Sequence, residues 1–440
     1  MYINVYHFDG EGSIVIDDYD TLRNLSFAPE ADLWGTSLPA NEFTVDVVTT
    51  DEIEIGYYVE LYDDLDNLYA FYWIFRAEKV EATITRITAR TVIGLLDNVK
   101  MPAVMYANEN AEDAIEACFD ASEAAFTSGL RFDSSFDNVT ISGFCPEQTA
   151  RERVTWILFT IGGYAKTAFC DEIEILPIDS TETLIPVDRT FWKPTVTYSD
   201  WVTAIRAKYY SFVQGTPGTT DEYVTDGEGT TYIVTATEVS LANPDAPGAA
   251  PANVVDISDV TLLNSANVSG ILTRLSQRYF KRITVEADVI DNAEYVPGDK
   301  VIVYADENTL YGGYIESADF SFGVQSRARL KLAACDVREA AALTITCVYG
   351  DMVIGEGRYT FPVGYAYSVQ MHYIDWTMNG HRYIFRPTTA TVTGTMTAQG
   401  ATVEVEYAVA LDLHDGVLRV VSVDGISTTT ESGETVGVIE

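Results

Sequence analysis

Hydrophobic and polar residues alternate along most of the chain, in short runs separated by Asp, Asn, Gly and Pro. Within residues 1 to about 100, the alternation is clear at Phe43–Val48, Tyr58–Tyr62 and Ala82–Ala89. Alternation over four to eight residues is typical of strands with one buried face. We therefore expect a small β-barrel or sandwich in this part of the chain.

The period changes after about residue 100, where apolar residues recur every three or four positions. This spacing predicts one helix over Ala111–Phe126. A second helix is predicted after Thr149, because Glu152 follows at the spacing of a capping box and Gly162 provides a stop signal. These elements indicate an α+β insertion.

Alternating segments return at Trp201–Val213 and Thr230–Val239. A further amphipathic helix is predicted over Val268–Leu275, with Asn264 or Ser265 as its N-cap. The last hundred residues are rich in Thr, Val, Gly and Tyr, which favours strands.

These patterns predict a mainly β chain with an α+β insertion, two similar small β-barrels and a C-terminal β-rich extension. Five parts are expected in chain order: a first barrel, the insertion, a β-rich subdomain, a helix with the second barrel, and the extension. Their predicted bounds are 1–100, 101–190, 191–262, 263–340 and 341–440.

The two predicted barrels share a repeated stretch, 242 residues apart. Gly56–Tyr72 and Gly298–Tyr314 match without a gap at seven of seventeen positions. Upstream, Thr44-Val45-Asp46 resembles Thr284-Val285-Glu286. The identical pairs are Gly56/Gly298, Val59/Val301, Tyr62/Tyr304, Asp64/Asp306, Leu68/Leu310, Tyr69/Tyr311 and Tyr72/Tyr314. Similar strand order on both sides favours duplication over convergence of common turn residues, so three copies of the chain would present six similar modules.

The charge excludes one class of function. The chain has 27 Lys and Arg against 66 Asp and Glu, a formal net charge of −39. Tight binding to nucleic acid needs clustered Lys and Arg side chains, which displace counterions from the phosphates. The excess of acidic residues therefore argues against a nucleic-acid-binding protein. The spread of acids fits either a solvated surface or an electronegative pore wall that repels DNA phosphates. No window approaches 18 uninterrupted apolar residues, so we expect no membrane span.

The search for catalytic residues yields no site, and we predict no catalytic, cofactor-binding or metal-binding residues. The four histidines, His7, His372, His381 and His414, form no zinc-ligand pattern. Cys145 precedes a helix start, where a thiol pKa can fall, but no histidine is placed to form a nucleophilic pair. The five cysteines form no CxxC pair, so we expect no disulfide framework.

Three acidic clusters have the composition of calcium loops. They are Asp17-Asp18-Asp20, Asp63-Asp64-Asp66 and Asp306-Glu307-Asn308. The last two occupy matching places in the repeat, between strands. Hairpin-turn chemistry explains them without an ion, and we favour that interpretation.

Three segments carry a resemblance to a known family. Thr149–Cys170, TARERVTWILFTIGGYAKTAFC, resembles a helix of bacteriophage tail hub proteins and the strand after it. The run Trp34-Gly35-Thr36-Ser37-Leu38 and the following Glu42–Val45 are similar to the opening strand region of those proteins. Asn264–Tyr279 and Val296–Val303 resemble their later helix and the start of their second barrel. The resemblance covers about residues 1–340.

This resemblance is to the baseplate hub family, or to the N-terminal hub part of tail-associated lysins and prophage endopeptidase tail proteins. It implies a homotrimer whose six barrels form a pseudo-six-fold ring between the tail tube and a three-fold tip, with the genome DNA passing through. The implied partners are a distal tail or tube protein, a tape measure protein and a spike or fibre. The implied location is the virion tail, assembled in the host cytoplasm.

The sequence therefore favours a structural, non-enzymatic tail protein. Two alternatives depend on residues 341–440. One is a cell-wall hydrolase that uses His372 and His381. The other is a carbohydrate-binding module in which an exposed aromatic such as Trp376 stacks on sugars.

Overall fold

In the computed structural model the chain separates into two compact units, residues 1–303 with 312–336, and residues 304–311 with 337–440. The structure describes residues 2–6, 13–16, 22–63, 66–122, 129–185, 189–191, 193–290, 295–305, 309–322, 327–349, 352–362, 374–378, 381–385, 389–398, 401–414 and 417–423. Side chains are described within 2–5 and 22–338. No helix in these residues is long and apolar enough to cross a membrane.

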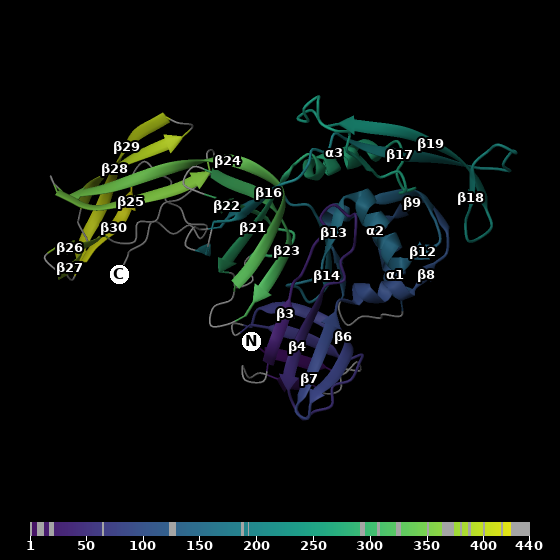
Figure 1. The fold of residues 1–440 in the computed structure, drawn as a ribbon, viewed down its shortest axis with the longest axis horizontal. Coiled ribbons are helices and arrows are strands. Elements are labelled where there is room, and N and C mark those ends of the chain that lie inside the picture. Colours follow the sequence, from purple (N-terminus) through teal and green to yellow (C-terminus); the bar gives the residue numbers. More distant parts are fainter. Residues whose placement is uncertain are drawn as a thin grey trace. The chain divides into compact units, whose positions relative to one another are not determined.

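The first unit begins with a curved antiparallel sheet, drawn in purple and blue in Figure 1. Its pairings give the order β2-β1-β5-β6-β7-β4-β3. The strands are β1 (Tyr2–Tyr6), β2 (Ser13–Ile16), β3 (Leu22–Phe27), β4 (Glu42–Val48), β5 (Tyr58–Tyr62), β6 (Leu68–Glu81) and β7 (Ile84–Arg90). We call this sheet the first module.

A second curved sheet repeats this strand order, and its residues up to 303 and from 312 to 336 belong to the first unit. β22 (Lys300–Tyr304), β23 (Thr309–Ser321), β24 (Arg327–Tyr349) and β21 (Ile283–Ile290) take the places of β5, β6, β7 and β4. At its edges lie β16 (Thr195–Tyr198), antiparallel to β21, and β15 (Glu182–Leu184), parallel to β22. The prediction of a mainly β chain with an α+β insertion is confirmed, and the two parts predicted as small barrels are curved antiparallel sheets of similar strand order.

The repeated residues have the same local geometry in the two modules. Gly56 has φ +96° and Gly298 has φ +110°, values that favour glycine. Each donates its N–H to an isoleucine carbonyl on the next strand, Ile74 or Ile315, at 2.9 Å. The identical pair Val59/Val301 is buried in both modules, so the match of sequence preserves the turn and part of the core. Tyr72 and Tyr314 are not structural counterparts, because Ile74 and Ile315 are only 241 residues apart: the ring of Tyr72 packs on Phe43, whereas that of Tyr314 packs on Trp34.

The register of the structure extends the repeat differently from the upstream sequence match. Asp46 lies opposite Arg86 on β7, and Asp288 lies opposite Arg329 on β24. The 242-residue offset therefore continues without a gap, pairing Asp46 with Asp288. The upstream match of Thr44–Asp46 with Thr284–Glu286 is wrong by two residues, a shift that keeps the same face of the strand inward and so preserves the alternation.

The α+β insertion packs two helices against short strands. α1 (Ala111–Asp120) begins at Asn110, and α2 (Ala150–Ile161) begins at the predicted capping box of Thr149 and Glu152. Gly162 ends α2 in the left-handed conformation. Around them lie η1 (Val92–Asn98), β8 (Lys100–Met101), β9 (Val104–Asn110), β10 (Leu130–Phe132), η2 (Ser134–Phe136), β11 (Thr140–Cys145), β12 (Gln148–Thr149), β13 (Gly163–Lys166) and β14 (Ile173–Pro177). The helices share one apolar core with η1 and these strands.

A long hairpin and a third helix complete the first unit. β17 (Ala204–Gln214) and β19 (Thr231–Ala242) form the hairpin, flanked by β18 (Tyr223–Thr225) and β20 (Val254–Asp256). α3 (Val268–Tyr279) packs beside β17. The predicted cap of α3 is wrong: the N-cap is Asn267, because the side chain of Asn264 instead accepts the N–H groups of Ala266 and Asn267.

The second unit consists of antiparallel strand pairs, which agrees with the predicted β-rich extension. The later part of β24 pairs with β25 (Met352–Pro362) and β28 (Thr389–Ala398). β28 pairs with β29 (Ala401–His414), which pairs with β30 (Val417–Val423). β26 (Ile374–Met378) and β27 (His381–Phe385) form a separate hairpin.

Candidate assembly site

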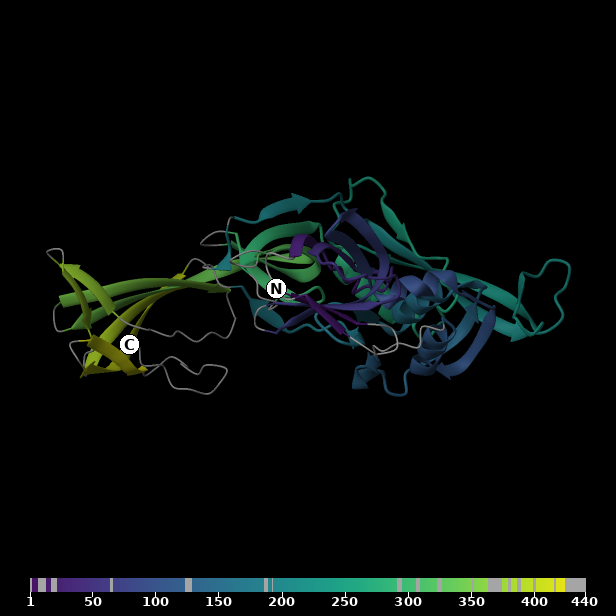
Figure 2. The same ribbon diagram turned by 90° about the horizontal axis from the view of Figure 1, so that it is seen from below.

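The two modules of the first unit are joined edge to edge by backbone hydrogen bonds. The chain that continues β3, residues 27–31, runs antiparallel to residues 316–320 of β23. Ala31 N donates to Glu316 O at 2.9 Å, and Ala318 N donates to Pro29 O at 3.1 Å. We call this contact the intrachain joint. Figure 2 shows the strands of the two modules from a second direction.

An aromatic cluster fills the inner side of the joint. Phe27 is fully buried and its ring stacks on Phe320 with centroids 5.8 Å apart. Tyr69, Tyr72 and Phe169 contribute rings at 5.9–6.3 Å from Phe27. Buried aromatic pairs stabilise a contact beyond the effect of burying their apolar surface area, so these rings make the joint part of the hydrophobic core.

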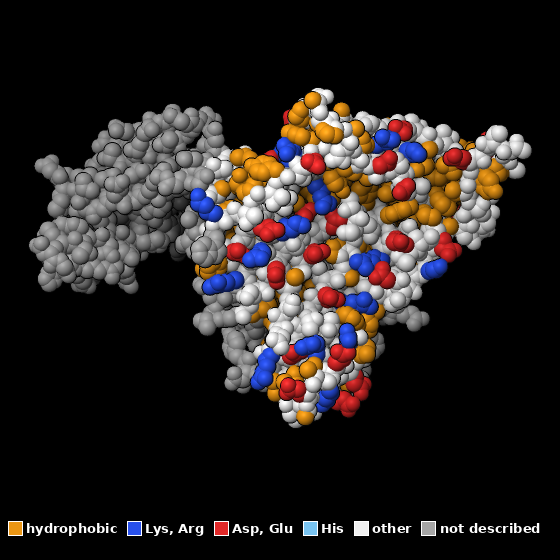
Figure 3. All heavy atoms as spheres, viewed as in Figure 1, with side chains coloured by type: hydrophobic (Ala, Val, Ile, Leu, Met, Phe, Trp, Pro, Cys, Tyr) orange, Lys and Arg blue, Asp and Glu red, His pale blue; other side chains and the backbone are white. Residues whose placement is uncertain are grey.

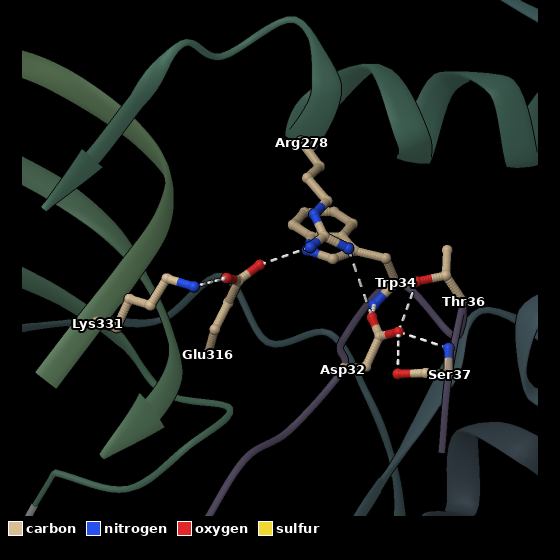
Figure 4. Close-up of polar contacts among 7 residues, drawn as sticks. All are labelled: Asp32, Trp34, Thr36, Ser37, Arg278, Glu316 and Lys331. Carbon is tan, nitrogen blue, oxygen red and sulfur yellow. Dashed lines mark hydrogen bonds and ion pairs between the residues drawn. The ribbon is translucent and has the colours of Figure 1, made fainter. Parts of the chain in front are cut away.

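A polar cluster closes the outer side of the joint, as Figure 4 shows. Asp32 Oδ2 accepts hydrogen bonds from Ser37 N and Thr36 Oγ1, both at 2.6 Å, and from Ser37 Oγ at 2.9 Å. Its Oδ1 accepts the N–H of Trp34 at 3.0 Å. The carboxylate therefore fixes the turn over residues 32–37.

Arg278, in the last turn of α3, bridges this turn to the second module. It donates to Glu316 Oε1 at 2.8 Å, and its other terminal nitrogen lies 3.7 Å from Asp32 Oδ1. Lys331 Nζ lies 3.8 Å from Glu316 Oε2. Two acids and two bases from four separate segments thus compensate one another around a polar cavity of about 190 Å³.

The turn approaches α2 at the position where the sequence has glycine. Gly35 has φ +69°, and a Cβ there would lie 2.8 Å from the Cα of Phe159. Trp34 is buried, with its ring edge-on to Tyr314 at 5.8 Å. The run Trp34–Leu38 is thus a turn and not part of a strand. It packs against α2 through Gly35 and against β23 of the second module through Trp34.

The described cysteines offer no reactive thiol. Cys118, Cys145, Cys170 and Cys335 are free. Burial raises the pKa of the Cys145 thiol to about 11, and that of Cys118 to about 12. The possibility of an activated Cys145 is therefore wrong, because β11 places it in the core of the insertion.

The acidic clusters lie partly outside the described residues, as do His7, His372 and the residues 306–308. Within the first repeat, Asp63 accepts the backbone and side-chain N–H groups of Asn67 at 2.9 and 2.8 Å. These bonds are those of a hairpin turn. Among the described residues, no group of His, Cys, Asp or Glu is placed to hold a metal ion.

On the face drawn in Figure 3, acidic and basic side chains are interspersed on the described surface. Apolar side chains gather where β17 and β9 lie. Lys and Arg side chains form no continuous stripe over the described surface of this face.

Comparison with solved structures identifies the fold. The tail protein from Neisseria meningitidis MC58 aligns with 76% of this chain and 96% of its own, with a TM-score of 0.50 and 11% identity. The prophage MuSo2 43 kDa tail protein from Shewanella oneidensis aligns with 76% of this chain and 99% of its own, with a TM-score of 0.51 and 10% identity. The chain has the fold of phage tail proteins. No protein-family model and no curated protein sequence matches it.

The fold shared with these tail proteins covers about three quarters of the chain. The sequence did not predict the intrachain joint. Thr36, Ser37, Arg278 and Glu316 carried no pattern that pointed to a cluster. One signal was present: the gapless 242-residue offset, followed upstream, aligns Asp46 with Asp288 and so predicts which strands are counterparts.

Proposed function

We propose that the chain is a structural, non-enzymatic component of a phage tail tip or baseplate, acting as a homotrimeric hub. The observation that carries this proposal is the pair of equivalent modules joined edge to edge inside one chain. Three chains so built supply six similar modules in a ring, which matches a six-fold tube on one face and a three-fold tip on the other. The fold shared with two phage tail proteins supports a role in the tail.

The charge suits a ring with a passage. Three chains at −39 each carry a formal charge of about −117. A wall of this sign repels DNA phosphates, so that the genome slides through without binding. The proposed partners are the tube or distal tail protein on one side and a spike or fibre on the other, within a virion tail assembled in the host cytoplasm.

Light scattering of the purified chain at moderate salt tests the proposal. A hub has a mass of three times 48.5 kDa, and negative-stain class averages of it show a ring with six similar lobes. A dimer, or a trimer without a central passage, would contradict the hub. Purified tail tube protein provides the second assay, because a hub caps the tube at one end.

A further inference from the structure

The outer edge of β6 is open beyond Ile74. β7 pairs with one edge of β6 from Trp73 to Glu81, while β5 covers the other edge from Leu68 only as far as Trp73. The last bonds on that side are from Ile74 N to Tyr57 O, at 2.8 Å, and from Gly56 N to Ile74 O, at 2.9 Å. In the described part of the chain no strand pairs with the edge that follows, where the Arg76 side chain is 62% exposed.

The counterpart of this edge in the second module is covered. Because Gly56 and Gly298 each donate to an isoleucine carbonyl, Ile74 corresponds in register to Ile315. The offset is 241 here and not 242, since the pairing of β5 with β6 contains a register shift between Leu61 and Tyr62. Residues 75–79 therefore correspond to residues 316–320, the part of β23 that pairs with residues 27–31 in the intrachain joint. The segments between the preceding strand and the glycine have equal length in the two modules, residues 49–55 and 291–297.

The covering segment also has a counterpart. β3 pairs with β4 as β16 pairs with β21, and the register places Phe27 opposite Phe43 and Val196 opposite Val285. Phe43 and Val285 are 242 residues apart, the offset of the repeat. Val196 is thus the equivalent of Phe27, and residues 198–200 are the equivalent of residues 29–31, which form the intrachain joint.

Residues 198–200 are themselves available for pairing. Ser199 N donates to Arg282 O at 2.8 Å, so the backbone groups of Tyr198 and Asp200 that serve pairing point to the other side of the strand. Tyr198 is 58% exposed, and both Ser199 and Asp200 are exposed. Within the described residues that side of β16 has no strand partner.

We propose that residues 198–200 of one copy pair antiparallel with residues 75–77 of β6 in the next copy, repeating the intrachain joint between chains. The register of the joint sets Ser199 opposite Arg76. The backbone bonds are then Asp200 N to Phe75 O and Ala77 N to Tyr198 O. The occupant is a second copy because the chain carries both halves of a contact that it already makes once internally, and open strand edges favour such pairing.

This inference rests on the proposed trimer, where three contacts between chains alternate with three intrachain joints to close the ring. Cysteine cross-linking of the full chain tests it. In the intrachain joint, Glu30 faces Ser317 between the two flanking hydrogen bonds, a position where Cα atoms lie about 4.5 Å apart. Such a separation is within the range that a disulfide spans.

The test variant is Arg76→Cys with Ser199→Cys, both at exposed positions. After mild oxidation it gives bands of two and three chains on a non-reducing gel, and peptide mass spectrometry finds residue 76 linked to residue 199. The matched control, Glu30→Cys with Ser317→Cys, oxidises within a single chain and stays at 48.5 kDa. The two single variants, Arg76→Cys and Ser199→Cys, show the background of random collision.

The outcomes separate this inference from the hub. A trimer by light scattering in which the test variant stays uncross-linked, while the control oxidises, overturns the edge pairing and leaves the hub standing. Cross-linking that extends into an open ladder beyond three chains supports the edge pairing and overturns the closed hub. Cross-links no more frequent than in the single variants overturn the pairing.

Discussion

Asp46 and Arg86 face each other across β4 and β7, with 2.6 Å between Asp46 Oδ1 and Arg86 Nε. The corresponding pair of the second module, Asp288 and Arg329, is separated by 2.9 Å. The first carboxylate is buried, its side chain 6% exposed, while that of Asp288 is 37% exposed. One position of the repeat thus carries the same ion pair in two environments.

This difference predicts unequal effects of the same substitution. We expect Asp46→Asn to lower the free energy of unfolding by about 1–3 kcal/mol, because it weakens bonds to a buried charged group. Asp288→Asn is expected to cost at most about 0.5 kcal/mol, as for other exposed pairs. Urea unfolding of both variants measures this, and equal losses would show that burial does not govern the pair.

The same pair predicts a pH dependence. The hydrogen bond from the Arg86 side chain lowers the pKa of Asp46 below its usual value. Between the lowered pKa of the folded state and about pH 3.9, the value for an unfolded chain, the unfolded state therefore binds more protons than the folded state. Stability from this group is present above that pH and is lost as pH falls through the folded pKa. Comparing the wild-type chain with Asp46→Asn between pH 5 and 2.5 isolates the loss.

Gly35 predicts a large effect of a single methyl group. Gly35→Ala is expected to cost about 2–4 kcal/mol, because the residue has positive φ and its Cβ would meet the backbone of α2. Gly229→Ala is the matched control, since Gly229 has φ +87° but nothing within 4 Å of an added Cβ. We expect that variant to cost about 1–2 kcal/mol, from φ alone. Thermal unfolding of both variants measures the two losses of stability. The difference between them gives the cost of the contact with α2 apart from the cost of positive φ.

The capping box of α2 predicts a local loss of stability. Thr149→Ala removes the acceptor for Glu152 N and is expected to cost about 1 kcal/mol. Thr155→Ala serves as the control within the same helix, because its hydroxyl only bonds back to Arg151 O at 2.8 Å. Its effect is expected within about 0.5 kcal/mol. Hydrogen exchange of the first turn reports the cap directly, and unchanged protection in Thr149→Ala would contradict it.

Asp32 predicts a coupling between the turn and the intrachain joint. Asp32→Ala leaves the N–H groups of Trp34 and Ser37 without their acceptor and is expected to cost about 2–3 kcal/mol. Asp319→Ala, an exposed acid on β23, is expected to change stability by less than about 0.5 kcal/mol. Chemical denaturation measures both, and a silent Asp32→Ala would show that Arg278 and Glu316 hold the joint without the turn.

The sequence predicted those features that are set by neighbours along the chain. The capping box at Thr149 was correct because cap and helix are three residues apart. The helix from Ala111 was predicted to continue past Asp120, where α1 ends, because Ala-rich spacing goes on without a stop signal. The last part of that prediction, residues 123–126, lies outside the described residues. Asn264 was a poor guide to α3 because Asn side chains bond equally well to a turn that precedes a helix.

Long-range contacts could not be predicted in the same way. The repeat showed that two modules were similar but not that β3 and β23 would join, because no pattern marks residues 27–31 as a strand edge. Arg278, Glu316 and Lys331 are ordinary surface residues by sequence. The five-part division of the chain remains a prediction.

The intrachain joint has a consequence for how the chain folds during synthesis. Phe320 follows Phe27 by 293 residues. At about 5–20 residues per second, roughly 15–60 s pass between the emergence of Phe27 and that of its ring partner. Throughout that interval an aromatic side chain and an unpaired strand edge of the first module are exposed on the nascent polypeptide. We therefore expect a chain terminated before β23 to expose this edge and the Phe27 ring permanently, and so to be prone to edge-to-edge association.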